Sequence, residues 1–143
     1  MGHVLLVVCL SVIALVGSAW GAESGFVPAG SFTIAALNGE PVAAKDDAQV
    51  PTMEFLATDQ RVAGTSGINR YAGGFTWQGE QLTFGQLLST MMAGSEPAMQ
   101  REQAFLKVLS VPLTVTKVDQ GFQLAGTMGK LVLVKSEAPV NPR

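Results

Sequence analysis

The fold depends on the stretch from Val62 to Phe75, Val-Ala-Gly-Thr-Ser-Gly-Ile-Asn-Arg-Tyr-Ala-Gly-Gly-Phe, in which four of the fourteen residues are glycine. Glycine accepts positive φ angles and lets the backbone lie close to a neighbouring segment. The stretch lies between two runs with β-strand character, so its glycine content predicts a sharply bent crossing rather than a plain strand. We expect this crossing to determine the shape of the domain.

Short alternating segments flank the glycine-rich stretch on both sides. Residues 31–37 alternate apolar and small side chains and end in Asn38-Gly39, a dipeptide typical of tight turns. Further strands are expected at 52–57 and 61–66, which form a hairpin, at 74–78 and 81–84, which form another, and at 113–118, 122–125 and 130–135, which form an antiparallel meander. Residues 85–94 are expected to be extended.

One amphipathic helix is expected between the second hairpin and the meander. Ser95 is a suitable N-cap, with an acid and a proline in the first turn, and the helix ends at Leu109 before Ser-Val-Pro. Its apolar stripe at a period of 3.6 comprises Ala98, Met99, Phe105, Leu106 and Leu109. Glu102 falls within this stripe, so its carboxylate needs a partner. The residues therefore predict a mainly β (α+β) fold of seven to eight short strands with one amphipathic helix.

The chain is long enough for one domain, at 143 residues with 48% hydrophobic composition. Val4 to Val16 is an apolar run followed by small residues, as in a secretory signal peptide cleaved after Ala19 or Gly21. We expect a signal peptide over 1–21, a lead segment over 22–29, the domain over 30–135 and a flexible tail over 136–143. An uncleaved N-terminal membrane anchor is the alternative, and membrane contact is expected only through that segment.

The composition excludes several functions. The net charge is −2 and no basic run is present, which argues against nucleic acid as a partner. His3 and Cys9 are the only histidine and the only cysteine, and cleavage of the signal peptide removes both. The mature chain therefore cannot form a Ser-His-Asp triad, a cysteine nucleophile, a zinc site with His or Cys ligands, or an internal disulfide. We expect no enzyme, and no catalytic, cofactor or metal site.

An ordered set of motifs gives the chain a family resemblance. The motifs are Val62-x-Gly64-x-x-Gly67-Ile68-Asn69-Arg70-Tyr71-x-Gly73, Leu82-x-Phe84, Ser89-Thr90-Met91-Met92-Ala93 and Glu102-x-x-Phe105-Leu106. Together they resemble the META domain, the family of the HslJ-type bacterial heat-shock protein, over roughly Gly30 to Val134. The resemblance implies a strongly curved antiparallel sheet or open barrel, with one helix across an open side. It also implies a small envelope or secreted protein linked to stress tolerance or virulence, with no agreed reaction.

The sequence departs from the family pattern at several positions. The family commonly has one cysteine before the Asn-Arg pair and another after the Met pair, where this chain has Ile68 and Gly94. The joint loss is what removal of a crosslink would produce. Met91 replaces the arginine usual before the Met pair, and Phe32 replaces the opening tryptophan. These changes affect functions that depend on a disulfide or on that arginine, and leave the fold in place.

Six residues are candidates for a structural or binding site, namely Gly64, Gly67, Asn69, Arg70, Tyr71 and Glu102. The favoured interpretation is structural: Asn69 adopts a left-handed turn conformation and Arg70 neutralises a buried acid. Glu102 is expected to be largely buried and paired with Arg70, Arg61 or backbone amides of residues 64–70. The alternatives are a recognition edge around Arg70 and a catalytic acid at Glu102.

Two further groups have weaker functional interpretations. Met91, Met92 and Met99 are close in sequence and are expected to fill the core, with Cu(I) binding as the alternative. Asp46-Asp47 is expected to be a solvated loop, with cation binding as the alternative.

The leading functional hypothesis is a non-catalytic, exported protein, periplasmic or secreted. It binds an unknown protein partner of the cell envelope or acts in the stress response. Two alternatives stay open. One is a small protease inhibitor that uses the Asp46 loop or the Arg70 turn, and the other is a binder of a small apolar ligand enclosed by the sheet.

Overall fold

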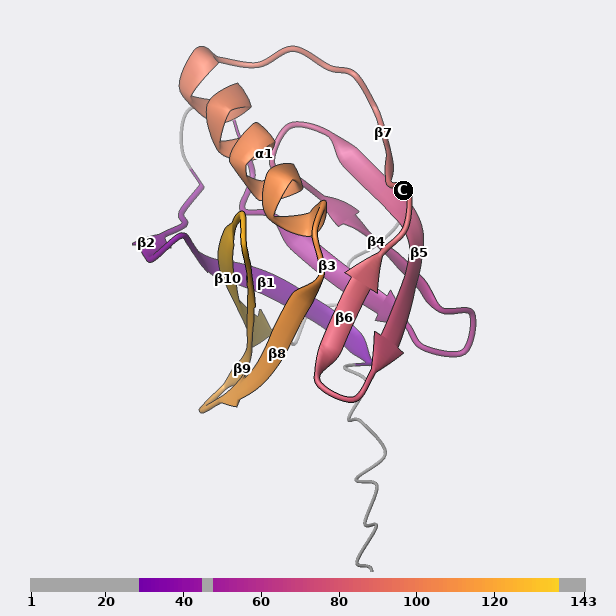
Figure 1. Cartoon of the computed structure of the whole chain (residues 1–143). Coiled ribbons are helices and arrows are strands. Elements are labelled where there is room, and N and C mark those ends of the chain that lie inside the picture. The colour runs from indigo at the N-terminus through magenta and orange to yellow at the C-terminus, as the bar shows by residue number, and fades with distance from the viewer. Residues whose placement is uncertain (1–28, 45–47, 137–143) are drawn as a thin grey trace, which may run out of the picture.

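The computed structural model describes residues 29–44 and 48–136 (Figure 1). The expected signal peptide, most of the lead segment, Asp46-Asp47 and nearly all of the expected tail lie outside the described residues. The described part of the chain contains no helix with the length and apolar character needed to cross a membrane.

The described residues contain ten strands and one helix. Their bounds are β1 Gly30–Leu37, β2 Glu40–Pro41, β3 Thr52–Leu56, β4 Arg61–Thr65, β5 Arg70–Gln78, β6 Gln81–Phe84, β7 Leu88–Ser89, α1 Glu96–Leu109, β8 Leu113–Val118, β9 Gly121–Gly126 and β10 Gly129–Lys135. Nearly all lie where the sequence predicts them. The Asn38-Gly39 turn has positive φ at both residues, 54° and 88°, which suits the tight connection between β1 and β2.

Eight of the strands form a closed antiparallel barrel in the order β1-β3-β4-β5-β6-β8-β9-β10, and β10 pairs back with β1. β2 extends the sheet beside β1, and β7 pairs with β5 outside the barrel path. The structure confirms the mainly β fold, and it shows that the sheet closes. The seam between β6 and β8 is short, with only Gln81↔Thr114 and Leu82↔Leu113 as residue partners.

The prediction of a bent crossing over residues 62–75 was wrong. The stretch is an antiparallel hairpin, in which β4 and β5 pair directly from Arg61↔Gly74 to Thr65↔Arg70. The chain reverses within residues 66–69, where Gly67 has a φ of 120°. Gly64 lets β4 lie close to β3 and does not bend the chain, because a Cβ at this position would overlap the Thr52 carbonyl of β3.

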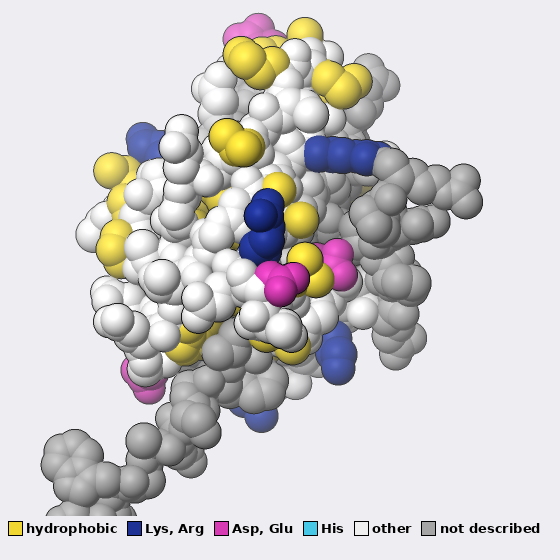
Figure 2. All heavy atoms as spheres, turned by 90° about the vertical axis from the view of Figure 1, so that its right-hand side faces the viewer, with side chains coloured by type: hydrophobic (Ala, Val, Ile, Leu, Met, Phe, Trp, Pro, Cys, Tyr) yellow, Lys and Arg dark blue, Asp and Glu magenta, His cyan; other side chains and the backbone are white. Residues whose placement is uncertain are grey.

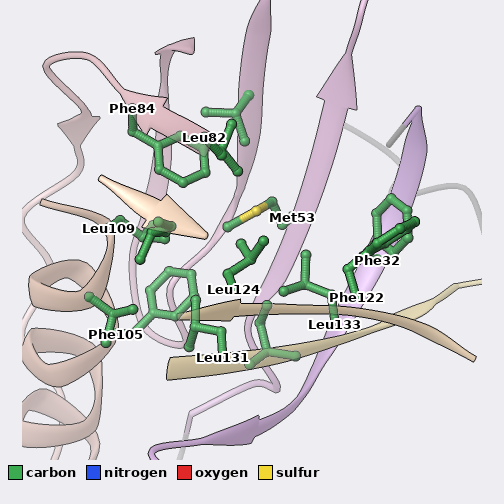
Figure 3. Close-up of a cluster of buried hydrophobic side chains, with 14 of the residues drawn as sticks. Phe32, Met53, Leu82, Phe84, Phe105, Leu109, Phe122, Leu124, Leu131 and Leu133 are labelled. Carbon is green, nitrogen blue, oxygen red and sulfur yellow. The ribbon is translucent and has the colours of Figure 1, made fainter. Parts of the chain in front are cut away.

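Inward-facing side chains fill the barrel. Fully buried members of this core include Ile34, Met53, Phe55, Leu82, Leu124, Leu131 and Leu133. Figure 3 shows Met53 in the middle of the labelled side chains, with Leu124 beside it. Phe32 makes edge contacts with Phe55 and Phe122, at ring distances of 6.0 and 5.8 Å.

The helix α1 covers one end of the barrel (Figure 1). Ser95 is its N-cap residue, as predicted, and Ala98, Phe105, Val108 and Leu109 are buried. The Phe105 ring lies 5.6 Å from the Tyr71 ring of β5, centroid to centroid. Met99, expected in the apolar stripe, is 37% exposed, and Val108 is buried instead.

Candidate functional site

The Glu102 carboxylate joins α1 to the turn between β4 and β5. Its Oε2 accepts hydrogen bonds from Ser66 Oγ at 2.8 Å, Asn69 N at 3.0 Å and Ile68 N at 3.3 Å. Its Oε1 accepts one from Asn69 Nδ2 at 2.7 Å. All four donors lie within residues 66–69, so one helical side chain holds the whole turn. We call residues 66–69 together with Glu102 the clamp.

Of the partners expected for Glu102, the structure confirms the backbone amides of residues 64–70, at Ile68 and Asn69, and the arginine alternatives were wrong. Within the described residues its donors are the amides and side chains of the clamp, and Arg61 and Arg70 are both exposed. The side chain is half-buried rather than largely buried. Partial burial alone would raise the pKa of the Glu102 carboxyl, but the hydrogen bonds from Asn69, Ser66 and the two amides hold that pKa below its ordinary value. Glu102 is therefore ionised and fully engaged.

Asn69 uses every hydrogen-bonding position of its side-chain amide. Besides the bond to Glu102, Nδ2 donates to the Met92 carbonyl at 3.2 Å, and Oδ1 accepts from Met92 N at 2.6 Å and Thr90 Oγ1 at 2.9 Å. The two contacts with Met92 reproduce those of a neighbouring β-strand. Asn69 is only 5% exposed, so this buried amide fixes the backbone of residues 90–92 against the hairpin.

The expected left-handed conformation of Asn69 was also wrong. Among the described residues, positive φ outside glycine occurs at Asn38 and Gln60, and in the turn it belongs to Gly67. Asn69 is needed for its side chain rather than for its backbone angles.

Tyr71 and Gly64 form a second internal contact next to the clamp. The Tyr71 hydroxyl donates to the Thr52 carbonyl at 2.7 Å, and the ring is 2% exposed. Burial raises the pKa of the Tyr71 phenol well above its ordinary value. A side chain at Gly64 would meet both the Thr52 carbonyl and the Tyr71 hydroxyl. Both residues thus stabilise the packing of β3, β4 and β5.

The methionines near the helix are on the surface, and the prediction that they fill the core was wrong. Met91 is 98% exposed and Met92 64%, and Leu88 on the same segment is 71% exposed. We call Leu88, Met91 and Met92 the apolar ridge. Figure 2 shows the face that includes β5 and β7, where hydrophobic side chains lie exposed among polar ones. The ridge is held by the backbone pairing of β7 with β5 and by the Asn69 contacts to Met92.

A cleft of about 560 Å³ lies beside the ridge, on the outer face of β3, β4, β5 and β7. Its lining includes Ala63, Arg70, Ala72 and Leu88. Because Met53, Phe55 and Val62 point into the barrel, the alternating residues Glu54 and Ala63 point outward. The cleft is therefore on the outer wall, and not inside the barrel as expected for an enclosed apolar ligand.

A second cleft of about 530 Å³ adjoins the first and shares Gln49, Thr65 and Arg70 with it. It extends past Ile68 and Met92 to Ser95 at the start of α1. Arg70 lines both clefts. Its amide donates to Thr90 Oγ1 and its carbonyl accepts from the Thr90 amide, and its guanidinium makes no hydrogen bond or ion pair with any described residue.

The hydroxyl and the carboxylate of the clamp are both occupied by internal hydrogen bonds. Ser66 is 1% exposed, and its hydroxyl is engaged by Glu102 and the Asn69 carbonyl, so it is neither accessible nor activated by a base. Glu102, with its lowered pKa, is a weak base. In residues 29–44 and 48–136 no group of three or more His, Cys, Asp or Glu side chains is placed to hold a metal ion.

Sequence reasoning found the clamp residues Asn69 and Glu102 but missed Ser66 and the cleft. The signal for Ser66 was its position in a glycine-rich turn, because Glu102 in the apolar stripe of the helix needed hydrogen-bond donors from such a turn. Ala63 and Ala72 are small residues that alternate with buried residues on β4 and β5. This alternation was the sequence signal for a hollow on the outer wall. The two positions that commonly hold cysteine in the family are in contact, since a Cβ at Gly94 would lie 3.0 Å from Ile68 Cγ1.

Comparisons with known proteins agree with this fold. The family model described as META domain matches residues 26–139. No curated protein matches the chain in sequence. One protein solved by NMR is similar with a TM-score of 0.61 and 20% identity, over 78% of this chain and 92% of that one. An NMR structure of a protein from Burkholderia xenovorans has a TM-score of 0.60 and 28% identity, over 76% and 83% of the two chains.

Proposed function

This chain belongs to the META domain family, and from that premise we propose that it is a non-catalytic, exported protein that binds a protein partner of the cell envelope through the apolar ridge. The resemblance to heat-shock members of the family adds a role in the stress response to the proposal. The exposed ridge is the observation on which the proposal depends.

Three features of the ridge support protein binding. Its side chains are large and apolar and come from one short segment, with exposed fractions of 71%, 98% and 64% at Leu88, Met91 and Met92. Contiguous exposed apolar side chains mark interaction sites, and methionine adapts to partner surfaces of different shape. The backbone beneath Met92 is fixed by Asn69, so binding requires little further ordering of this segment.

Export is proposed from the sequence of the N-terminal region. The apolar run Val4 to Val16 and the small residues up to Gly21 support a cleaved signal peptide and a periplasmic or secreted location. Mass spectrometry of the protein isolated from the cell envelope should find a mature N-terminus after Ala19 or Gly21. Recovery of the intact chain from the cytoplasm would contradict export.

Site-specific photo-crosslinking tests partner binding. A photoreactive amino acid in place of Met91 should give a discrete covalent adduct in the cell envelope, more abundant after heat stress if the stress role holds. The matched control has the same amino acid in place of Met128, which is 46% exposed on the turn between β9 and β10. The adduct at 91 should disappear when Leu88 and Met92 are both replaced by serine. Equal adducts at 91 and 128 would contradict a specific ridge.

A small apolar ligand is the second candidate, because the volume of the cleft is in the range of small-molecule sites. Extraction of the purified protein with organic solvent, followed by mass spectrometry, tests it. A stoichiometric apolar compound that is absent from an Ala72→Leu variant would favour this candidate. The protease-inhibitor hypothesis gains no support from Arg70, which begins a strand paired on both sides instead of projecting on a loop.

A further inference from the structure

The outer wall beside the ridge has a regular arrangement of side chains. Glu54, Ala63, Ala72 and Leu88 are successive cross-strand partners on β3, β4, β5 and β7. Neighbouring strands lie about 4.8 Å apart, so Glu54 and Leu88 are separated by about 14 Å across the wall. Only the methyl groups of the two alanines lie between them. This row therefore forms a hollow with an acid at one side and an exposed leucine at the other.

The adjacent row supplies an exposed cation, Arg70. Thr65 and Arg70 are cross-strand partners, and Thr90 donates its amide to the Arg70 carbonyl. Arg70 lies two residues before Ala72 on β5, so both side chains point outward, about 7 Å apart along the strand. The guanidinium is exposed and makes no hydrogen bond or ion pair within residues 29–44 and 48–136.

We propose that the cleft binds an extended peptide segment of the partner, with an apolar side chain in the hollow over Ala63 and Ala72 and a carboxylate on Arg70. This inference rests on the proposed function and specifies the chemistry of the partner. In an extended peptide, side chains two positions apart lie on the same face at the spacing of Ala72 and Arg70. The recognised motif is therefore an apolar residue and an acid separated by one residue.

Charge complementarity selects the acid and its position. Arginine binds carboxylates with two parallel hydrogen bonds, and it is enriched among the residues that dominate binding energy. Glu54 at the far side of the hollow repels a carboxylate placed there, which favours the register with the acid on Arg70. Leu88 extends the apolar contact from the hollow to the ridge.

Selection from a random heptapeptide display library tests the motif. The purified protein, an Arg70→Glu variant and a Lys117→Glu control are used as targets, since Lys117 is an exposed cation on β8 away from the cleft. The wild type and the control should enrich peptides with an apolar residue and an acid at a spacing of two. Arg70→Glu should lose these peptides or enrich a base in place of the acid.

A binding titration by fluorescence polarisation then measures the effect on one selected peptide. Ala72→Leu, which fills the hollow, and Arg70→Glu should each weaken binding at least tenfold, and Lys117→Glu should leave it within twofold. Melting curves of all variants confirm that they fold. Failure to enrich the motif, or enrichment that Arg70→Glu leaves unchanged, would overturn this inference. The proposed function would still be judged by the crosslinking at Met91, which does not depend on the motif.

Discussion

The clamp and the apolar ridge are neighbours with opposite character. In the clamp, polar side chains are buried or half-buried, and each hydrogen-bonding position of Asn69 is used. In the ridge, apolar side chains are exposed and contact little of the protein. Asn69 connects the two, because the same amide binds Glu102 on one side and the Met92 backbone on the other.

The difference separates a structural role from a binding role. A fully satisfied buried network gives a segment one conformation, since each broken hydrogen bond leaves a polar group without water. Exposed apolar side chains contribute little to folding and are available to a partner. Variants in the clamp should therefore change stability, and variants in the ridge should change binding.

Replacing Asn69 should have the largest effect. Asn69→Ala leaves the Met92 amide and carbonyl without partners and removes a donor from Glu102, which should lower the free energy of unfolding by about 4 kcal/mol. Chemical denaturation measures it. Asn69→Asp tests the same contact by charge, because its carboxylate would face that of Glu102. This raises one pKa of the pair, so the variant should regain stability as the pH falls through that pKa. A loss below about 1 kcal/mol in both variants would contradict the role of the clamp.

A disulfide between positions 68 and 94 should stabilise the protein, because it joins the turn of the hairpin covalently to the segment that carries the ridge. The contact of Ile68 with Gly94 brings a Cβ at 94 to 3.0 Å from Ile68 Cγ1, which suits a crosslink. In an Ile68→Cys, Gly94→Cys variant, the oxidised form should be more stable than the reduced form by roughly 3 kcal/mol. Thermal melts with and without reductant measure this, and the single variants are the controls. Failure of the two thiols to pair would show that the positions are not in register.

Glu102→Gln should have a smaller, pH-dependent effect. The amide nitrogen of glutamine faces Asn69 Nδ2, and the charge is lost, so stability at pH 7 should fall by about 2 kcal/mol. The pKa of the Glu102 carboxyl is lower in the folded state, so its contribution is present above the unfolded pKa and is lost as pH falls through the folded pKa. The difference between wild type and variant should therefore shrink below about pH 5. A difference that is constant with pH would argue against an ionised Glu102.

Serine at all three ridge positions should have the smallest effect on stability. Leu88, Met91 and Met92 are mostly exposed, and Met92 joins the clamp only through its backbone. The free energy of unfolding, measured by chemical denaturation, should change by less than about 0.5 kcal/mol for each replacement, although serine at 88 and 92 should abolish the crosslink from a photoreactive residue at 91. A strongly destabilised triple variant would show that the ridge is part of the core.

The sequence predicted those features that depend on local patterns. The strands, the Asn38-Gly39 turn and the start of α1 at Ser95 follow from alternation, turn residues and capping, and the structure confirms them. The acid in the apolar stripe of α1 correctly predicted contact with backbone amides near the glycine-rich stretch.

The features that were missed depend on neighbours far apart in the chain. Whether Gly64 bends the backbone or lets β3 approach depends on Thr52, which the local sequence does not indicate. Met91 and Met92 were assigned to the core because methionine commonly fills gaps beside a helix, but Asn69 holds their segment outside the barrel. The cleft arises from alanines on different strands, Ala63 and Ala72, and their pairing is a property of the sheet register.

The seam between β6 and β8 has the fewest residue pairs of any seam in the closed barrel. Its residue partners are Gln81↔Thr114 and Leu82↔Leu113, and the Val115 amide also donates to the Glu80 carbonyl at 2.7 Å, whereas β9 and β10 pair over six positions. Transient opening should therefore begin at this seam, and the amide protons of Leu82 and Leu113 should exchange with deuterium earlier than those of Leu124 and Leu131. The helix α1 lies between β6 and β8 in the chain, so we expect its docking on the turn between β4 and β5 through Glu102 to limit how far this seam opens.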